Sequence, residues 1–157
     1  MCTNDFDLNI FTQILREELV PAMGCTEPIA LAFAGAKARE VLGALPDKVV
    51  VEASGSIIKN VKSVVVPNTG NLKGIPAAVS AGITLGNADK KLEVLSDIKE
   101  DDIPKIGKFM EGTEIEVKHL KSGFNFDIIL TAEKGENYSR IRITNAHTNI
   151  TLIEKDG

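Results

Sequence analysis

Cysteine, tryptophan and long apolar or basic runs are scarce in this chain of 157 residues. It has two cysteines, no tryptophan, one tyrosine and a net charge of −4. The longest apolar stretch, Pro28 to Ala36, is too short to cross a bilayer, so no membrane association is expected. No run of Lys and Arg exceeds two residues, which argues against nucleic-acid binding.

The few cysteines and the first residues indicate where the protein works. Two distant cysteines do not form a disulfide framework. The opening sequence, MCTNDFDLNI, lacks the basic and apolar regions of a signal peptide. We therefore expect a cytoplasmic protein, and its length and 43% apolar content suit one domain with one core.

Apolar spacing predicts helices in the first two thirds of the chain. Residues 6–20 carry apolar side chains at helical intervals and end at Pro21. Residues 27–42 and 75–86 are apolar on nearly all sides, so we expect another domain or a second copy of the chain to cover them. Shorter helices are expected at 89–95 and 99–112, the latter with Ile103, Ile106 and Met110 on one face.

β-Branched and alternating runs predict strands in the remainder. The expected strands span residues 48–54, 61–66, 113–119, 124–133, 138–146 and 149–154. KSG (121–123) and KGEN (134–137) have the composition of hairpin turns. This order of elements favours an α+β fold, with helices packed on a largely antiparallel sheet.

One cysteine lies in a motif that could carry chemistry. In Gly-Cys-Thr-Glu-Pro, residues 24–28, Thr26 suits a helix N-cap, and Glu27 and Pro28 suit a first turn. Cys25 therefore lies at a helix start, where the helix dipole favours a thiolate that can act as nucleophile, base or metal ligand. The alternative is a small apolar residue buried in a tight turn.

Two further segments carry polar groups between regular elements. Asn68, Thr69 and Gly70 belong to a strand-to-helix loop that could present N–H groups to an anion, or could be plain turn chemistry. His147 interrupts two β-rich runs together with Thr148 and Asn149, and is either a base or substrate donor or a structural histidine. We expect these segments and Cys25 to lie on one side of the fold, whereas His119 ends a strand and looks like a surface residue.

Four segments resemble one known family. PAMGCTEPIALA, KNVKSVVVPNTG, GIPAAVSAGITLGNADKKLEVL and NAHTNITLIE are similar to the N-terminal region of L-cysteine desulfidases and of iron–sulfur-dependent L-serine dehydratase alpha chains. The resemblance covers nearly the whole chain, and the Gly-Cys-Thr-Glu-Pro turn is its most specific part. It implies that the chain is the single N-terminal domain, residues 1–157, of a longer iron–sulfur lyase in amino-acid catabolism.

The resemblance also implies a reaction. Family enzymes remove hydrogen sulfide from L-cysteine or water from L-serine, and the enamine product hydrolyses to pyruvate and ammonia. The cofactor is a [4Fe–4S] cluster, without pyridoxal phosphate, and one of its cysteines matches Cys25. We expect Cys25 and His147 to be catalytic, with Cys25 either a cluster ligand or a base. The expected substrate-binding residues are Thr26, Glu27, Lys59, Asn60, Asn68, Thr69, Gly70, Thr148 and Asn149.

The number of cysteines departs from the family pattern. A cluster of this kind needs three or four protein thiolates, and the chain has only Cys2 and Cys25. We therefore expect the other ligands to come from a C-terminal cluster domain that this chain lacks, and the isolated chain to be inactive. The alternatives are a non-catalytic amino-acid-binding module and a thiol hydrolase that uses Cys25 and His147. The choice between cysteine and serine as substrate stays open.

Overall fold

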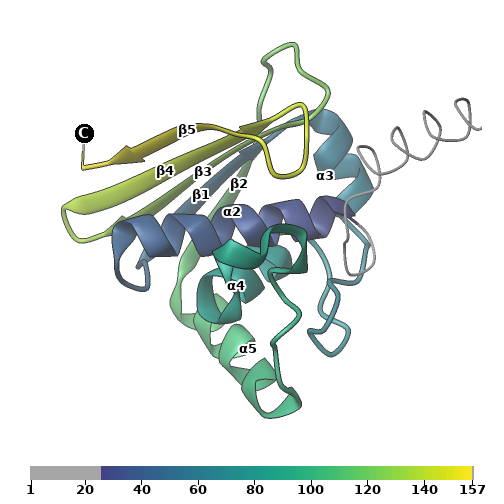
Figure 1. Cartoon of the computed structure of the whole chain (residues 1–157), viewed down its shortest axis with the longest axis vertical. Coiled ribbons are helices and arrows are strands. Elements are labelled where there is room, and N and C mark those ends of the chain that lie inside the picture. The colour runs from purple at the N-terminus through teal and green to yellow at the C-terminus, as the bar shows by residue number, and fades with distance from the viewer. Residues whose placement is uncertain (1–25, 157) are drawn as a thin grey trace, which may run out of the picture.

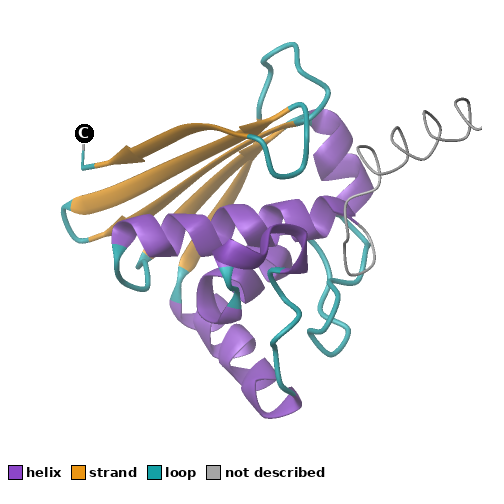
Figure 2. Ribbon diagram, in the orientation of Figure 1, coloured by secondary structure: helices purple, strands orange, loops and turns teal. Residues whose placement is uncertain are grey.

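The computed structural model describes residues 26–156 of the chain. These residues form helices on one side of a five-stranded sheet (Figures 1 and 2). The helices are α2 (Thr26–Leu42), α3 (Gly55–Val61), α4 (Ile75–Leu85), the 3-10 turns η1 (Ala88–Glu93) and η2 (Glu100–Asp102), and α5 (Ile103–Gly112). The strands are β1 (Lys48–Ala53), β2 (Glu114–His119), β3 (Asp127–Lys134), β4 (Asn137–Thr144) and β5 (Ile150–Lys155). The helix expected at residues 6–20 lies outside the described part.

The sheet has the strand order β2-β1-β3-β4-β5. All neighbouring strands are antiparallel except β1 and β2, which are parallel. The α+β class with a largely antiparallel sheet is therefore confirmed. In Figure 2 the helices lie below the sheet, and its upper face is not covered by a helix of the described residues.

Alternation along the strands separates the two faces. In β1, Val49, Val51 and Ala53 are fully buried against the helices, while the residues between them are only half-buried. The same alternation places Ile141 and Ile143 of β4 on the helix side. The core therefore lies between this face of the sheet and the helix layer.

Small residues bring α2 and α4 into close backbone contact. A Cβ added at Gly82 would lie 1.9 Å from the backbone oxygen of Ala32, and one at Gly35 would lie 2.7 Å from that of Val79. No side chain fits between the helices at these points. Residues 28–36 of α2 and 77–83 of α4 are all buried in this chain. The expectation that these apolar helices require a second copy or another domain to cover them was therefore wrong.

Two local predictions were also wrong. Residues 61–66 do not form a strand, because Val61 ends α3 and Val65 makes only an isolated bridge to Lys73. Val61 and Val66 are instead buried in the core, which accounts for the apolar run without strand pairing. The KSG segment does not close a hairpin, because β1 lies between β2 and β3.

The remaining local predictions hold to different degrees. The Lys134–Asn137 segment is a hairpin turn between β3 and β4. In α5, Ile106 is buried as expected, but Phe109 is its buried companion, and Ile103 and Met110 are half-buried. None of the helices between residues 26 and 156 has the length and apolar character needed to cross a membrane.

Candidate functional site

The candidate residues of α2, α3 and the β4–β5 turn lie towards one end of the strands. At this end β1 and β2 finish and the chain turns from β4 into β5 (Figure 1). Both α2 and α4 begin there, because they run side by side in the same direction, with Gly82 against Ala32 and Gly86 against Ala36. The loop before α4, residues 67–74, therefore reaches the same end of the molecule as the first turn of α2.

Glu27 is the centre of a polar cluster at the start of α2. The side-chain amide of Asn60, in the last turn of α3, donates a hydrogen bond to Glu27 Oε1 at 3.2 Å. The charge of Glu27 also acts on His147, in the turn between β4 and β5. A carboxylate in the first turn of a helix is stabilised by the helix dipole. Three distant segments of the chain thus contribute to one cluster, defined here as Glu27, Asn60 and His147.

His147 is half-buried, and its ring packs against Phe126 with the ring centres 4.6 Å apart. Burial lowers the pKa of His147 from its ordinary value of 6.5, and the charge of Glu27 only partly opposes this effect. The imidazole is therefore neutral at pH 7, with a lone pair that can accept a proton or a hydrogen bond.

Asn149 shapes the turn that carries His147. Its side-chain amide donates to the backbone oxygen of Thr144 at 2.9 Å, and its backbone oxygen accepts from the Thr144 N–H at 3.2 Å. Asn145 has a positive φ of 66°, which asparagine tolerates better than most residues. Thr148 is half-buried beside them. Asn149 thus acts on the position of His147 through the backbone of the turn.

The side chains of Asn68 and Thr69 have partners within the fold. Thr69 is buried, and its hydroxyl donates to the backbone oxygen of Val66 at 2.6 Å. Asn68 donates to the backbone oxygen of Leu95 at 3.1 Å. Asn68 and Gly70 both have positive φ, 61° and 67°. The Thr69 bond and the two positive φ values are those of a tight turn, one of the two interpretations of this loop, whereas the Asn68 bond ties the loop to the distant Leu95.

Lys59 lies apart from the Glu27 cluster. It lines a depression of about 480 Å³ together with Gly55, Ile58, Lys62 and His119. Lys59 and Asn60 are consecutive on a helix, so their side chains leave it in directions about 100° apart. His119 is exposed as expected, but it is also part of this cationic depression, which the sequence did not indicate.

Cys25 lies outside the described residues. It immediately precedes Thr26, the half-buried residue with which α2 begins, and Glu27 follows. The motif that contains the thiol therefore leads directly into the helix turn that carries the cluster.

Comparison with known proteins gives homology but no reaction. No protein-family model and no solved structure matches the chain. It is 54% identical over 147 residues to a UPF0597 protein of Desulfitobacterium hafniense and 52% identical over 144 residues to one of Lachnoclostridium phytofermentans. A UPF0597 protein of Treponema denticola is 42% identical over 146 residues. The alignments cover 94%, 92% and 93% of this chain and 34% of each relative.

The chain is homologous to the N-terminal third of UPF0597 proteins. It spans about a third of the length of the curated relatives that it matches. The designation UPF0597 specifies no reaction, so the lyase chemistry implied by the resemblance is a proposal for this UPF0597 homologue.

The residues of this UPF0597 homologue do not suffice for an iron–sulfur cluster. Residues 26–156 contain no cysteine and no group of three His, Cys, Asp or Glu side chains that could hold a metal ion. The two cysteines of the whole chain are fewer than the three or four thiolates that a [4Fe–4S] cluster requires. At most, the chain contributes ligands to a cluster that other residues complete.

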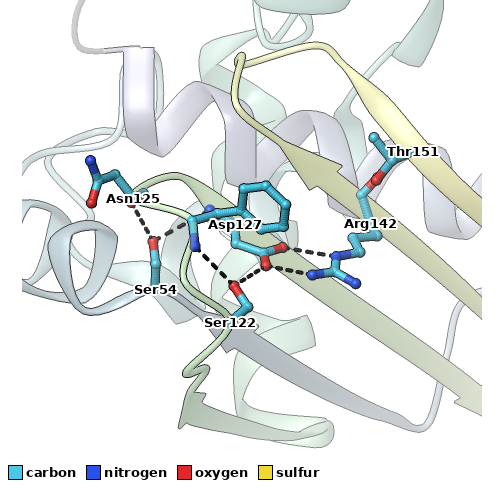
Figure 3. Close-up of polar contacts among 7 residues, drawn as sticks. Ser54, Ser122, Asn125, Asp127, Arg142 and Thr151 are labelled. Atoms are coloured by element: carbon cyan, nitrogen blue, oxygen red, sulfur yellow. Dashed lines mark hydrogen bonds and ion pairs between the residues drawn. The ribbon is translucent and has the colours of Figure 1, made fainter.

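Sequence reasoning missed a second polar cluster, on the open face of the UPF0597 homologue's sheet (Figure 3). Asp127, at the start of β3, is fully buried and forms an ion pair with Arg142 of β4 at 2.7 Å. A carboxylate at the start of the apolar run Ile128–Leu130 was the available signal, because a charge in a core strand requires a partner.

Proposed function

We propose that this chain is the substrate-binding part of an iron–sulfur-dependent lyase that eliminates hydrogen sulfide from L-cysteine or water from L-serine. The enamine product then takes up water and yields pyruvate and ammonia. The observations that carry the proposal are the hydrogen bond from Asn60 to Glu27 and the effect of the Glu27 charge on His147, directly after the Gly-Cys-Thr-Glu-Pro turn. The resemblance supplies the reaction, and the cluster supplies groups suited to it.

Each group has a role that follows from its chemistry. An amino acid carries an ammonium group, which the Glu27 carboxylate attracts while the Asn60 amide holds that carboxylate in place. Elimination removes the proton from the α-carbon, and a neutral imidazole can accept it. Burial keeps His147 in the neutral form. In this proposal Cys25 supplies a thiolate at the start of α2, as a ligand or as a base.

The test uses a protein in which the chain is joined to the remaining two thirds of the Desulfitobacterium hafniense relative. After anaerobic iron–sulfur reconstitution, this fusion should show cluster absorbance and should release pyruvate from L-cysteine or L-serine. The chain alone should do neither, since it has two cysteines. His147→Gln should lower kcat by about a hundredfold or more, the usual contribution of a general base.

Cys25→Ser in the same fusion separates the two roles of the thiol. If Cys25 is a ligand, turnover and cluster absorbance are both lost. If it is a base, only turnover is lost. Cys2→Ser is the matched control, because Cys2 is the chain's other cysteine and lies outside the motif. Full activity of Cys25→Ser would contradict the proposal.

A non-catalytic amino-acid-binding module is the second candidate. The favouring observation is that the described cluster has a carboxylate, an amide and an imidazole, which suffice to bind an amino acid. In calorimetry, the isolated chain would then bind L-cysteine or L-serine, and Cys25→Ser would bind equally well. Glu27→Gln should weaken that binding about tenfold through loss of one charge-assisted contact.

A further inference from the structure

Arg142 is held rigidly on the open face of the sheet. Its neighbours Ile141 and Ile143 are fully buried under the helices, so the Arg142 side chain points to the opposite face of the sheet. Its Nε donates to Asp127 Oδ1 at 3.1 Å and its Nη2 to Asp127 Oδ2 at 2.7 Å. This two-point contact fixes the plane of the guanidinium (Figure 3).

Asp127 is itself fixed by neighbouring groups. The Ser122 hydroxyl donates to its Oδ2. Its backbone N–H donates to Ser54 Oγ at 3.4 Å, and the Ser54 hydroxyl donates to the Asn125 oxygen at 2.8 Å. Figure 3 shows these residues around the carboxylate. The hydrogen bond with Asp127 raises the pKa of Arg142, so the arginine is a permanent cation at any physiological pH.

A depression of about 360 Å³ lies beside this arginine. It is lined by Phe124, Arg142, Thr144, Thr151 and Leu152. The pairing of β4 with β5 shifts here, from Arg142 opposite Leu152 to Ile143 opposite Ile150, which leaves Thr151 as an extra residue. Such a bulge bends the strand and re-aims its side chains, and bulges are frequent next to binding sites.

Two properties of the depression suit a small carboxylate with an apolar body. Arg142 donates to Asp127 through Nε and Nη2, and its Nη1 has no partner among residues 26–156. The Arg142 side chain is 30% exposed and lines the depression. Phe124, 44% exposed, and half-buried Leu152 offer apolar contact.

The geometry points to a binding site for a small aliphatic carboxylate, with its oxygens on the outer edge of Arg142 and its body between Phe124 and Leu152. This site lies on the opposite face of the sheet from the helices and uses none of the residues of the Glu27 cluster. Its existence is therefore independent of the proposed lyase function. Asp127 already neutralises much of the arginine's charge, so we expect an affinity in roughly the millimolar range.

The test is titration of the ¹⁵N-labelled chain with 3-methylbutanoate and, separately, with the uncharged 3-methylbutanamide. We expect saturable shifts of amide signals around Arg142 and Thr151 with the carboxylate only. Arg142→Lys keeps the charge but removes the planar fork, and should weaken binding about tenfold or more. Arg140→Lys, two residues away on the same face, is the matched control and should bind within about twofold of wild type.

A second variant keeps the test decisive if Arg142→Lys disturbs folding. Leu152→Glu leaves the Asp127–Arg142 pair intact and places a like charge in the depression, so saturable binding should be lost. Equal binding of acid and amide, absence of saturable shifts with wild type, or unchanged binding in Leu152→Glu would each overturn the inference.

Discussion

The two faces of the sheet use different chemistry. On the helix-covered face, neighbouring strands contribute fully buried aliphatic side chains such as Val51, Leu130 and Ile141. On the open face, Arg140 and Glu154 of adjacent strands form an ion pair at 3.1 Å that stays partly exposed. The covered face gains stability from removal of apolar area from water, whereas exposed charges contribute little. The open face can therefore carry binding groups at little cost to the fold.

The largest expected difference in stability is between two adjacent residues of β4 whose side chains point to opposite faces of the sheet. Ile141→Ala should lower the free energy of unfolding by about 3 kcal/mol, because it leaves a cavity in the core. Arg140→Ala removes a half-exposed ion pair and should cost less than about 1 kcal/mol. Urea unfolding followed by circular dichroism measures both. Similar losses in the two variants would contradict the division between the faces.

The helix layer that packs on the covered face should be nearly as sensitive. Gly82→Ala places a Cβ 1.9 Å from the backbone oxygen of Ala32, so α2 and α4 must separate, at a cost of about 2 kcal/mol. Gly107→Ala is the matched control in α5, where an added Cβ meets nothing within 4 Å. There we expect no loss, or a gain of up to about 1 kcal/mol from helix propensity. Thermal unfolding should thus show a lower melting temperature for Gly82→Ala but not for Gly107→Ala.

A smaller effect distinguishes the two ion pairs of the open face. Asp127→Asn leaves Arg142 without its charge partner and should lower the free energy of unfolding by about 1 to 2 kcal/mol. Glu154→Gln should cost less than about 0.5 kcal/mol, because both partners of that pair are partly exposed. Denaturant midpoints of the two variants give the comparison. An equal loss in both would mean that Asp127 gains nothing from its burial and its two-point contact.

The smallest expected effect is a pH dependence of stability that comes from His147, in the turn between β4 and β5. The folded state lowers the pKa of His147 below 6.5. As pH falls below 6.5 the unfolded chain takes up the proton first, so stability decreases until the pH passes the folded-state pKa. His147→Gln should remove this part of the decrease below about pH 7. His119→Gln is the matched control, and an unchanged slope in His147→Gln would show that burial does not act on this ring.

Local pattern predicted those elements whose own residues form a continuous apolar or β-branched run. Examples are the apolar runs of α2 and α4 and the β-branched run of β1, whose sequences alone indicate that these segments are buried. The strand predicted at 61–66 was wrong because Val61, four residues after Ile57, is buried on one side of a short helix, while Val66 is buried in the loop that follows. A run of buried valines alone does not show whether the segment is a strand, a helix or a loop, because that depends on the elements packed against it.

The site could be predicted only in part for the same reason. The motifs of α2 and of the β4–β5 turn were recognisable as polar interruptions of apolar runs. The pairing of Arg142 with Asp127 depends on the register of the β3–β4 hairpin, and the bond from Asn60 to Glu27 depends on the packing of α3 against the start of α2. The polar patterns of the separate segments specify neither this register nor this packing.

The parallel pairing of β1 with β2 has a consequence for the order of folding. Lys48 pairs with Glu114 of β2 on one side and with Glu133 of β3 on the other, both far along the chain, whereas β3, β4 and β5 pair through short connections. Contacts between distant segments form late, since a long loop must be closed first. Until β2 docks, the outer edge of β1 is an unpaired run of valines, a form that readily joins another chain. Aggregation during refolding should therefore begin at β1, and conditions that delay the docking of β2 should increase it.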